Sequence, residues 1–148
     1  MAVNSQVQAW ISAFLNARSL QKPSGAPLYR YHVTEEEFAT LPSALSTTAH
    51  QIYSPVYGPY WAAAFCLFVA EQYRRDYQKD WKWQSFESIL NLELSAADHA
   101  EVVPKGLAFW NRDVQRREHG KDYLGSLFSE GGLSWALIQS EQHGFARA

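Results

Sequence analysis

The 148-residue sequence contains one cysteine and has no excess of basic charge. A lone cysteine, Cys66, excludes an internal disulfide and a zinc site built from several cysteines. Cys66 stands in an apolar run, whereas a reactive thiol needs a partly exposed and electropositive setting, so we expect it in the core. The net charge of −2 gives no general attraction for nucleic acid or an anionic membrane. Binding of that kind would need a local basic patch.

Long hydrophobic runs and a targeting signal are also missing. The longest apolar run, residues 60–70, is well short of the ~20 residues that span a bilayer. The N-terminus lacks a basic start followed by an apolar stretch, which a signal peptide requires. These absences predict a cytoplasmic domain with no membrane partner. At 148 residues the chain is the size of one domain, so we expect residues 1–148 to be a single α-helical domain. Residues 143–148 carry no signal that ends a folded unit, which favours the N-terminal module of a longer chain.

What the chain does contain is aromatic residues and helical periodicity. Aromatics make up 15% of the sequence, a content that suits either a rigid core or a binding platform. Apolar residues recur at helical spacing, which predicts an all-α, irregular multi-helix globular domain of six to eight short helices. Its central buried helix is expected at residues 60–77, which are apolar nearly all round in their first half. In the polar second half, Glu71 and Arg75 are spaced for an i,i+4 ion pair.

Capping and proline signals predict the other boundaries. Capping boxes, in which an N-cap side chain and the third helical residue satisfy each other's backbone N–H groups, are expected at Thr34–Glu37 and Ser95–Asp98. Pro104 is expected to interrupt the helix that begins after Ser95 and to start a fresh helical segment. The remaining expected segments are helices at 5–20, 34–45, 84–92 and 133–139, a helix that ends at Gly131, and a short extended piece at 28–33.

No catalytic or metal-binding pattern is present. The five histidines are scattered, and neither a nucleophile elbow nor a phosphate-binding loop occurs. We therefore predict no catalytic residue, metal or cofactor.

Glu130, followed by Gly131 and Gly132, has two interpretations. The glycines allow a left-handed helix cap and a close backbone approach. Glu130 would then form a structural ion pair with Arg112 or Arg75. In the other interpretation, the carboxylate faces a partner-binding or catalytic surface.

Basic residues occur in two regions, at the end of the central helix and in a polar segment near residue 115. If the two regions meet in space, they form a patch flanked by tryptophans, which could bind phosphates while the rings stack on bases. The expected members of this nucleic-acid patch are Arg74, Arg75, Arg112, Arg116, Arg117, Trp81 and Trp83. The ordinary alternative is that arginines complement the helix dipole and that residues 112–121 are a solvated segment with its own acids.

Four segments in order resemble a known type of protein. They are Glu71–Tyr77, Trp81–Trp83, Gly106–Arg112 and Tyr123–Leu133. Their order is similar to the N-terminal region of large bacterial proteins carried in genomic islands beside helicase genes, like phage-defence loci of the Druantia kind. The resemblance implies a module of a larger defence protein, and it supplies no catalytic residues.

Three functions follow from these observations. The leading hypothesis is a non-enzymatic module that docks a partner protein or further domains of its own chain. The second is nucleic-acid binding through the arginine and tryptophan patch. The third is an enzyme that uses Glu130 as an acid or base.

Overall fold

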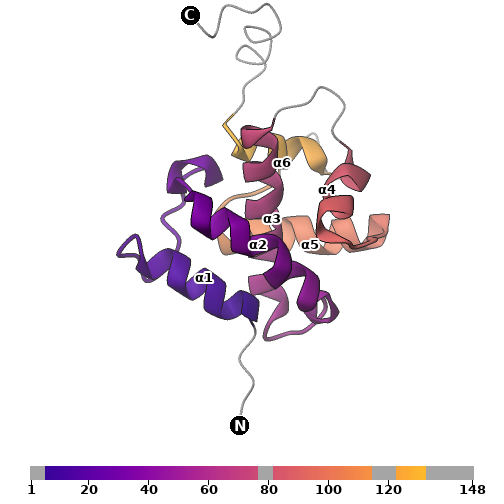
Figure 1. The fold of residues 1–148 in the computed structure, drawn as a ribbon, viewed down its shortest axis with the longest axis horizontal. Coiled ribbons are helices and arrows are strands. Elements are labelled where there is room, and N and C mark those ends of the chain that lie inside the picture. The colour runs from indigo at the N-terminus through magenta and orange to yellow at the C-terminus, as the bar shows by residue number, and fades with distance from the viewer. Residues whose placement is uncertain (1–5, 77–81, 115–122, 133–148) are drawn as a thin grey trace, which may run out of the picture.

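The computed structural model describes residues 6–76, 82–114 and 123–132, and these ranges are entirely helical or irregular (Figure 1). The all-α fold class is therefore confirmed. The described helices are α1 (Gln6–Asn16), η1 (Leu28–Tyr31), α2 (Glu35–Thr47), η2 (Ala49–Gln51), α3 (Gly58–Arg75), α4 (Trp83–Leu90), α5 (Ala96–Phe109) and α6 (Leu124–Glu130), where η1 and η2 are 3₁₀-helices. The predicted helix at 133–139 lies outside the described residues.

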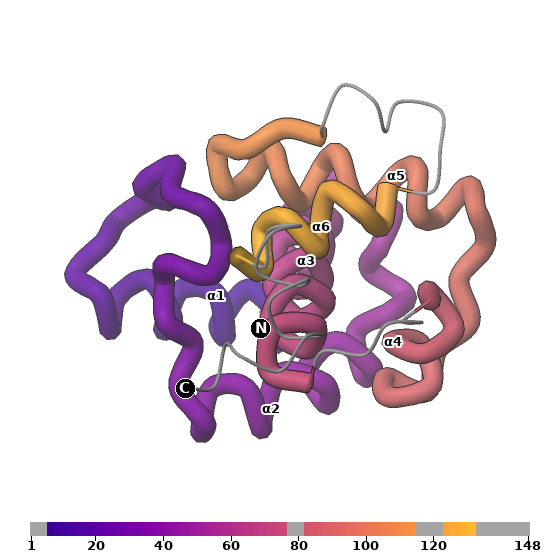
Figure 2. Tube along the Cα trace, turned by 90° about the horizontal axis from the view of Figure 1, so that it is seen from above, coloured from indigo at the N-terminus to yellow at the C-terminus, as the bar shows by residue number. Residues whose placement is uncertain are grey.

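Helix α3 lies at the centre of the fold. Figure 2 shows it nearly end-on, with the other α-helices arranged around it. It contacts α1, α2, α5 and α6, and its residues from Trp61 to Glu71 are all buried. A helix that is apolar nearly all round needs such cover on every side, so the predicted central helix is confirmed. Within the described ranges, no helix is both long and apolar enough to cross a membrane.

Helices α3 and α5 pack closely because α5 carries a glycine at the crossing. A Cβ atom on Gly106 would overlap the backbone of Ala62 and the sulfur of Cys66. Cys66 is fully buried there, as predicted, and burial raises the pKa of its thiol. One turn further along, the indole N–H of Trp110 donates to the carbonyl of Ala63 at 3.0 Å. The contact thus combines close backbone approach with a satisfied buried donor.

Two local predictions were wrong, one for the end of the first helix and one for residues 28–31. The first helix ends at Asn16 rather than near residue 20, because Ser19 adopts a left-handed φ of 58°. The N–H of Leu20 then donates back to the carbonyl of Leu15, which closes the helix end. Residues 28–31 form a 3₁₀-helix rather than an extended piece.

Pro104 does not interrupt α5, which corrects a further prediction. The helix runs unbroken from Ala96 to Phe109. Proline costs a helix one hydrogen bond, but Val103, Gly106 and Leu107 beside it are fully buried in the core. Tertiary packing therefore outweighs the local penalty.

Both predicted capping boxes are confirmed. The hydroxyl of Thr34 accepts from the N–H of Glu37 at 3.1 Å, and the Glu37 carboxylate accepts from the N–H of Thr34 at 2.9 Å. Ser95 and Asp98 make the equivalent pair of bonds at the start of α5.

Candidate functional site

Glu130 is buried at the end of α6 and joins three segments of the chain. Its side chain accepts from Nε of Arg112 at 3.0 and 3.1 Å, and Oε1 also accepts from the N–H of Leu28 at 3.1 Å. Only 5% of Glu130 is exposed. A charged carboxylate is stable at such a site because a cation and a backbone donor replace its lost hydration. This geometry favours the structural interpretation of Glu130, with Arg112 as its partner.

The two glycines after Glu130 seat the end of α6 against its neighbours. Gly132 has a φ of +84°, the left-handed conformation that the sequence predicts for this corner. A Cβ atom on Gly131 would lie 2.7 Å from the carbonyl oxygen of Ala70 in α3. A Cβ atom on Gly132 would lie 2.7 Å from Cγ of Tyr29 in η1. The corner therefore positions Tyr29 beside the end of α6.

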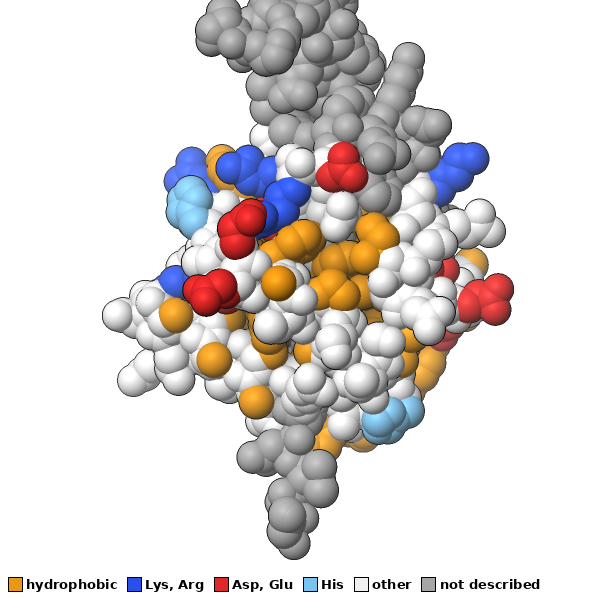
Figure 3. Space-filling model, viewed as in Figure 1, with side chains coloured by type: hydrophobic (Ala, Val, Ile, Leu, Met, Phe, Trp, Pro, Cys, Tyr) orange, Lys and Arg blue, Asp and Glu red, His pale blue; other side chains and the backbone are white. Residues whose placement is uncertain are grey.

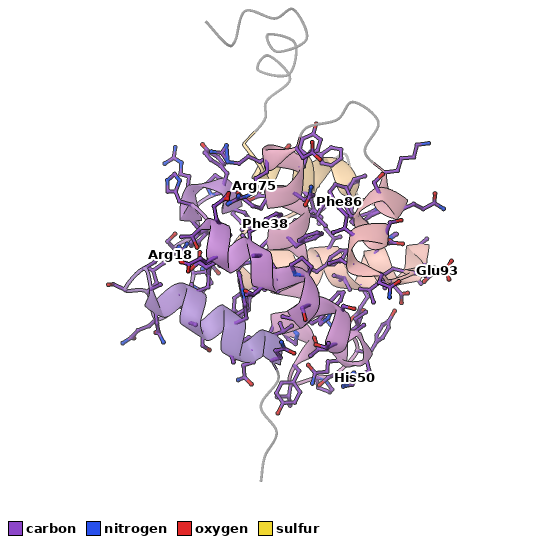
Figure 4. All side chains as sticks on the ribbon, viewed as in Figure 1. Arg18, Phe38, His50, Arg75, Phe86 and Glu93 are labelled. Atoms are coloured by element: carbon purple, nitrogen blue, oxygen red, sulfur yellow. The ribbon has the colours of Figure 1, made fainter. Side chains whose placement is uncertain are left out.

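Arg75 forms ion pairs and a hydrogen bond within the molecule. Its guanidinium bonds Glu71 at 2.6 Å and Glu35 at 3.1 Å, and it donates to the carbonyl of Val33 at 2.7 Å. The same group lies 4.7 Å from the ring centroid of Phe38, as Figure 4 shows for these two labelled side chains. Arg75 thus ties α3 to the start of α2, and its predicted ion pair with Glu71 is present.

Arg74, the neighbouring residue, belongs to a different group of side chains. It is exposed, and its Cζ lies 5.9 Å from the ring centroid of Tyr29. Arg30 approaches the same ring at 5.9 Å and donates from Nε to the Tyr29 hydroxyl at 3.4 Å. His32 lines a surface cavity together with Arg74. We call Arg30, His32 and Arg74, together with the Tyr29 ring that both arginines approach, the basic cluster.

Figure 3 shows basic and His side chains gathered at the upper left of the molecule, where η1 meets the end of α3, with acidic side chains beside them. In the described part of the chain, no carboxylate forms an ion pair with Arg30, His32 or Arg74. Arg30 and Arg74 thus present guanidinium groups that have no carboxylate partner among the described residues.

Sequence reasoning found Arg74 but missed Arg30 and His32. They are more than 40 residues away along the chain, and only the fold of η1 brings them to α3. His32 follows η1 in a left-handed conformation with a φ of 56°. The available signal was the alternation of aromatic and basic residues in the run from Tyr29 to His32, which the sequence analysis assigned to an extended piece.

The other predicted patch residues do not join this cluster. Arg112 bonds Glu130, and Trp83 is buried with its ring stacked on Phe65 and His99, so its faces are occupied. Centroid distances for these stacks are 5.8 and 4.0 Å. The remaining predicted members, Trp81, Arg116 and Arg117, lie outside the described residues.

A buried carboxylate and histidine form a second pair that the sequence did not reveal. Glu87 in α4 bonds Nε2 of His99 in α5 at 2.6 Å, and the two residues are 5% and 7% exposed. The other carboxylate oxygen of Glu87 accepts from the N–H of Leu94 at 3.2 Å. Both residues line a cavity of 710 Å³ between α4, the loop that follows it, and α5.

Carboxylate–histidine pairs occur among catalytic bases, but this pair also fixes a turn. Glu87 restrains the loop between α4 and α5, and the ring of His99 stacks on Trp83 in the core. A structural role therefore accounts for each of these contacts. Sequence spacing gave no signal, since the two residues stand on separate helices.

Comparison with known proteins identifies relatives. A family model described as the YjiT N-terminal domain matches residues 1–133. Protein YjiT from Escherichia coli (strain K12) is 36% identical over 141 residues, which cover 93% of this chain. The chain spans 27% of the length of that relative. No solved structure matches.

Proposed function

The chain belongs to the YjiT N-terminal domain family, and from that premise we propose that it is a non-enzymatic module that docks a partner protein or further domains of a longer chain. One observation carries the proposal, the contrast between buried and exposed charge. The buried carboxylates Glu71, Glu87 and Glu130 are each bonded to an arginine or histidine of the same domain. The exposed basic cluster has no such partner in the described ranges and is available to another surface.

The internal pairs weaken the case for the other two functions. A carboxylate that acts as acid or base must reach the substrate, whereas both oxygens of Glu130 accept internal hydrogen bonds. A nucleic-acid patch needs free cations and exposed rings. Of its described members, Arg75 and Arg112 are ion-paired and Trp83 is buried, so Arg74 is the one that faces solvent without a carboxylate partner.

The size of the relative supports docking as the role. Since the chain spans 27% of the length of Escherichia coli YjiT, most of such a protein lies outside this domain and is a source of docking surfaces. We extend the proposal to a cytoplasmic phage-defence system. Its support is the resemblance of four segments, from Glu71 to Leu133, to genomic-island proteins encoded beside helicases.

Co-purification tests the docking role. The tagged chain is expressed together with untagged proteins encoded beside its gene, and with the remainder of any longer protein that carries it. We expect one of these to co-elute in a stoichiometric complex, with a mass above the 16.9 kDa of the chain. A tagged helical domain of unrelated sequence and similar charge is the control. A 16.9 kDa monomer in every combination would contradict the proposal.

Phage challenge tests the defence role separately. Cells that carry the complete locus are compared with cells whose locus lacks this domain. We expect plaque numbers to rise when the domain is deleted. Equal plaque numbers across a broad phage panel would remove the defence role and leave the docking role to the co-purification result.

A further inference from the structure

We propose that the basic cluster is the docking site for a short acidic protein segment that presents two or more Asp or Glu carboxylates. The inference rests on the proposed docking function and adds the location and the chemistry of the occupant. Its basis is the approach of Arg30 and Arg74 to the ring of Tyr29 and the cavity that His32 and Arg74 line.

Among the described residues, the two arginines leave most of their N–H donors without a partner. Each guanidinium lies 5.9 Å from the centroid of the Tyr29 ring, and the ring itself is seated by the Gly132 corner. Arg30 makes one long hydrogen bond, to the Tyr29 hydroxyl at 3.4 Å. A guanidinium offers five N–H donors in a planar fork that matches a carboxylate. Arg30 and Arg74 can therefore each bind a carboxylate by donating hydrogen bonds to it, without breaking a strong internal bond.

A surface cavity beside Arg74 provides the space. It measures 390 Å³ and is lined by His32, Val33, Glu71, Arg74 and Arg75. Within this lining, Arg75 bonds the carboxylate of Glu71 at 2.6 Å, and it also bonds Glu35 at 3.1 Å, so its single charge offsets one of these two carboxylates. Of the arginines in this lining, Arg74 is the one that forms no ion pair with a carboxylate of the described residues, so its guanidinium is the group that meets an incoming anion.

The surroundings favour an acidic peptide over a nucleic acid. Nucleic-acid affinity grows with the number of phosphates that a row of cations neutralises. Here two described arginines without a carboxylate partner, Arg30 and Arg74, share one ring, and the carboxylate of Glu35 lies nearby, bonded to Arg75. The side chain of Glu35 is 90% exposed and would repel a phosphate backbone that continued past the cluster.

Fluorescence anisotropy with a labelled peptide of alternating glutamate and glycine tests the inference. We expect saturable binding by the 148-residue chain that declines as salt is added. Arg30→Ala and Arg74→Ala should each weaken it roughly fivefold, in the range of exposed charge pairs. Lys82→Ala is the matched control, an exposed cation just before α4, and should leave binding unchanged. The same peptide with glutamine in place of glutamate should not bind.

Three results would overturn the inference. They are absence of binding by the glutamate peptide, equal weakening by Lys82→Ala, and tighter binding of a DNA oligonucleotide through the same two arginines. Circular dichroism confirms that each variant is folded. In the co-purification experiment, a complex that survives Arg30→Glu combined with Arg74→Glu would refute this site while leaving the docking function standing. Absence of any complex with the unchanged chain would refute docking itself.

Discussion

Glu130 shows how one buried charge can organise distant parts of a chain. Its carboxylate accepts from Arg112 and from the backbone of Leu28, and Arg112 also donates to the carbonyl of Gly25 at 3.4 Å. The loop before η1 is thereby fixed to the end of α6. The value of such a pair depends on both partners, because a single buried charge left alone is costly.

We expect Arg112→Ala to lower the free energy of unfolding by about 3 kcal/mol, since it leaves the Glu130 carboxylate buried without its cation. The double variant Arg112→Met with Glu130→Gln should lose less unfolding free energy than the sum of the losses in the single variants Arg112→Met and Glu130→Gln. Urea unfolding monitored by tryptophan fluorescence measures both. Additive losses, or a loss for Arg112→Ala no larger than for Lys82→Ala, would show that the pair does not stabilise the fold.

At the scale of elements, the contact between α3 and α5 depends on the absence of a side chain. Gly106 lies so close to Ala62 and Cys66 that a Cβ atom at this position would clash with both. Helix propensity alone makes alanine better than glycine by about 1 kcal/mol in such a position. Propensity and packing therefore make opposite predictions for the same substitution.

We expect Gly106→Ala to destabilise the protein by about 2 kcal/mol, because the backbone of Ala62 cannot yield as a flexible side chain would. The control is Ala108→Gly at an exposed position of α5, where propensity predicts a loss of about 1 kcal/mol. Thermal and urea unfolding provide the measurements. If Gly106→Ala raised stability, the close helix contact described above would be wrong.

The junction of α1 and α2 is an ionic one and should respond to pH. Arg18 lies beyond the end of α1 and bonds both carboxylate oxygens of Glu37, at 2.7 and 2.8 Å. This hydrogen bonding by Arg18 lowers the pKa of Glu37 from its ordinary value. A carboxylate whose pKa is lowered by folding stabilises the native state above its unfolded pKa, and that contribution is lost as pH falls through the folded pKa.

We therefore expect the stability difference between the unchanged protein and Glu37→Gln to be largest near neutral pH and to shrink below about pH 4, as Glu37 protonates. Urea unfolding over a series of pH values tests this. Glu36→Gln, at an exposed neighbouring site, is the control. A difference between the two proteins that stays constant down to strongly acidic pH would contradict the role given to Arg18.

At the scale of the whole molecule, local signals in the sequence predicted the helices better than they predicted the surface. The central helix and both capping boxes depend on residues close together in the chain, and these predictions are confirmed. The continuous helix through Pro104 depends on burial against α3, which no local pattern encodes. Arg30 and His32 reach Arg74 through the fold alone, so the basic cluster could not be read from spacing.

We expect the described part of the chain to unfold as one cooperative unit. Its buried apolar residues form a single core that includes Trp61, Trp83 and Trp110. Far-UV circular dichroism, which follows the helices, and tryptophan fluorescence, which follows the core, should therefore give coincident transitions in urea. Two separated transitions would show that the helices around α3 form more than one folding unit.

The hydrogen bond between Glu130 and the backbone of Leu28 can form only late in translation. The two residues are 102 positions apart, and α5 and α6, which cover α3, follow α3 in the chain. At about 5–20 residues per second, the ribosome takes on the order of seconds to extend the chain from the end of α3 to the end of α6. During that interval the part of α3 that α5 and α6 cover stays exposed, so chaperones that bind nascent apolar segments should meet this domain before it closes.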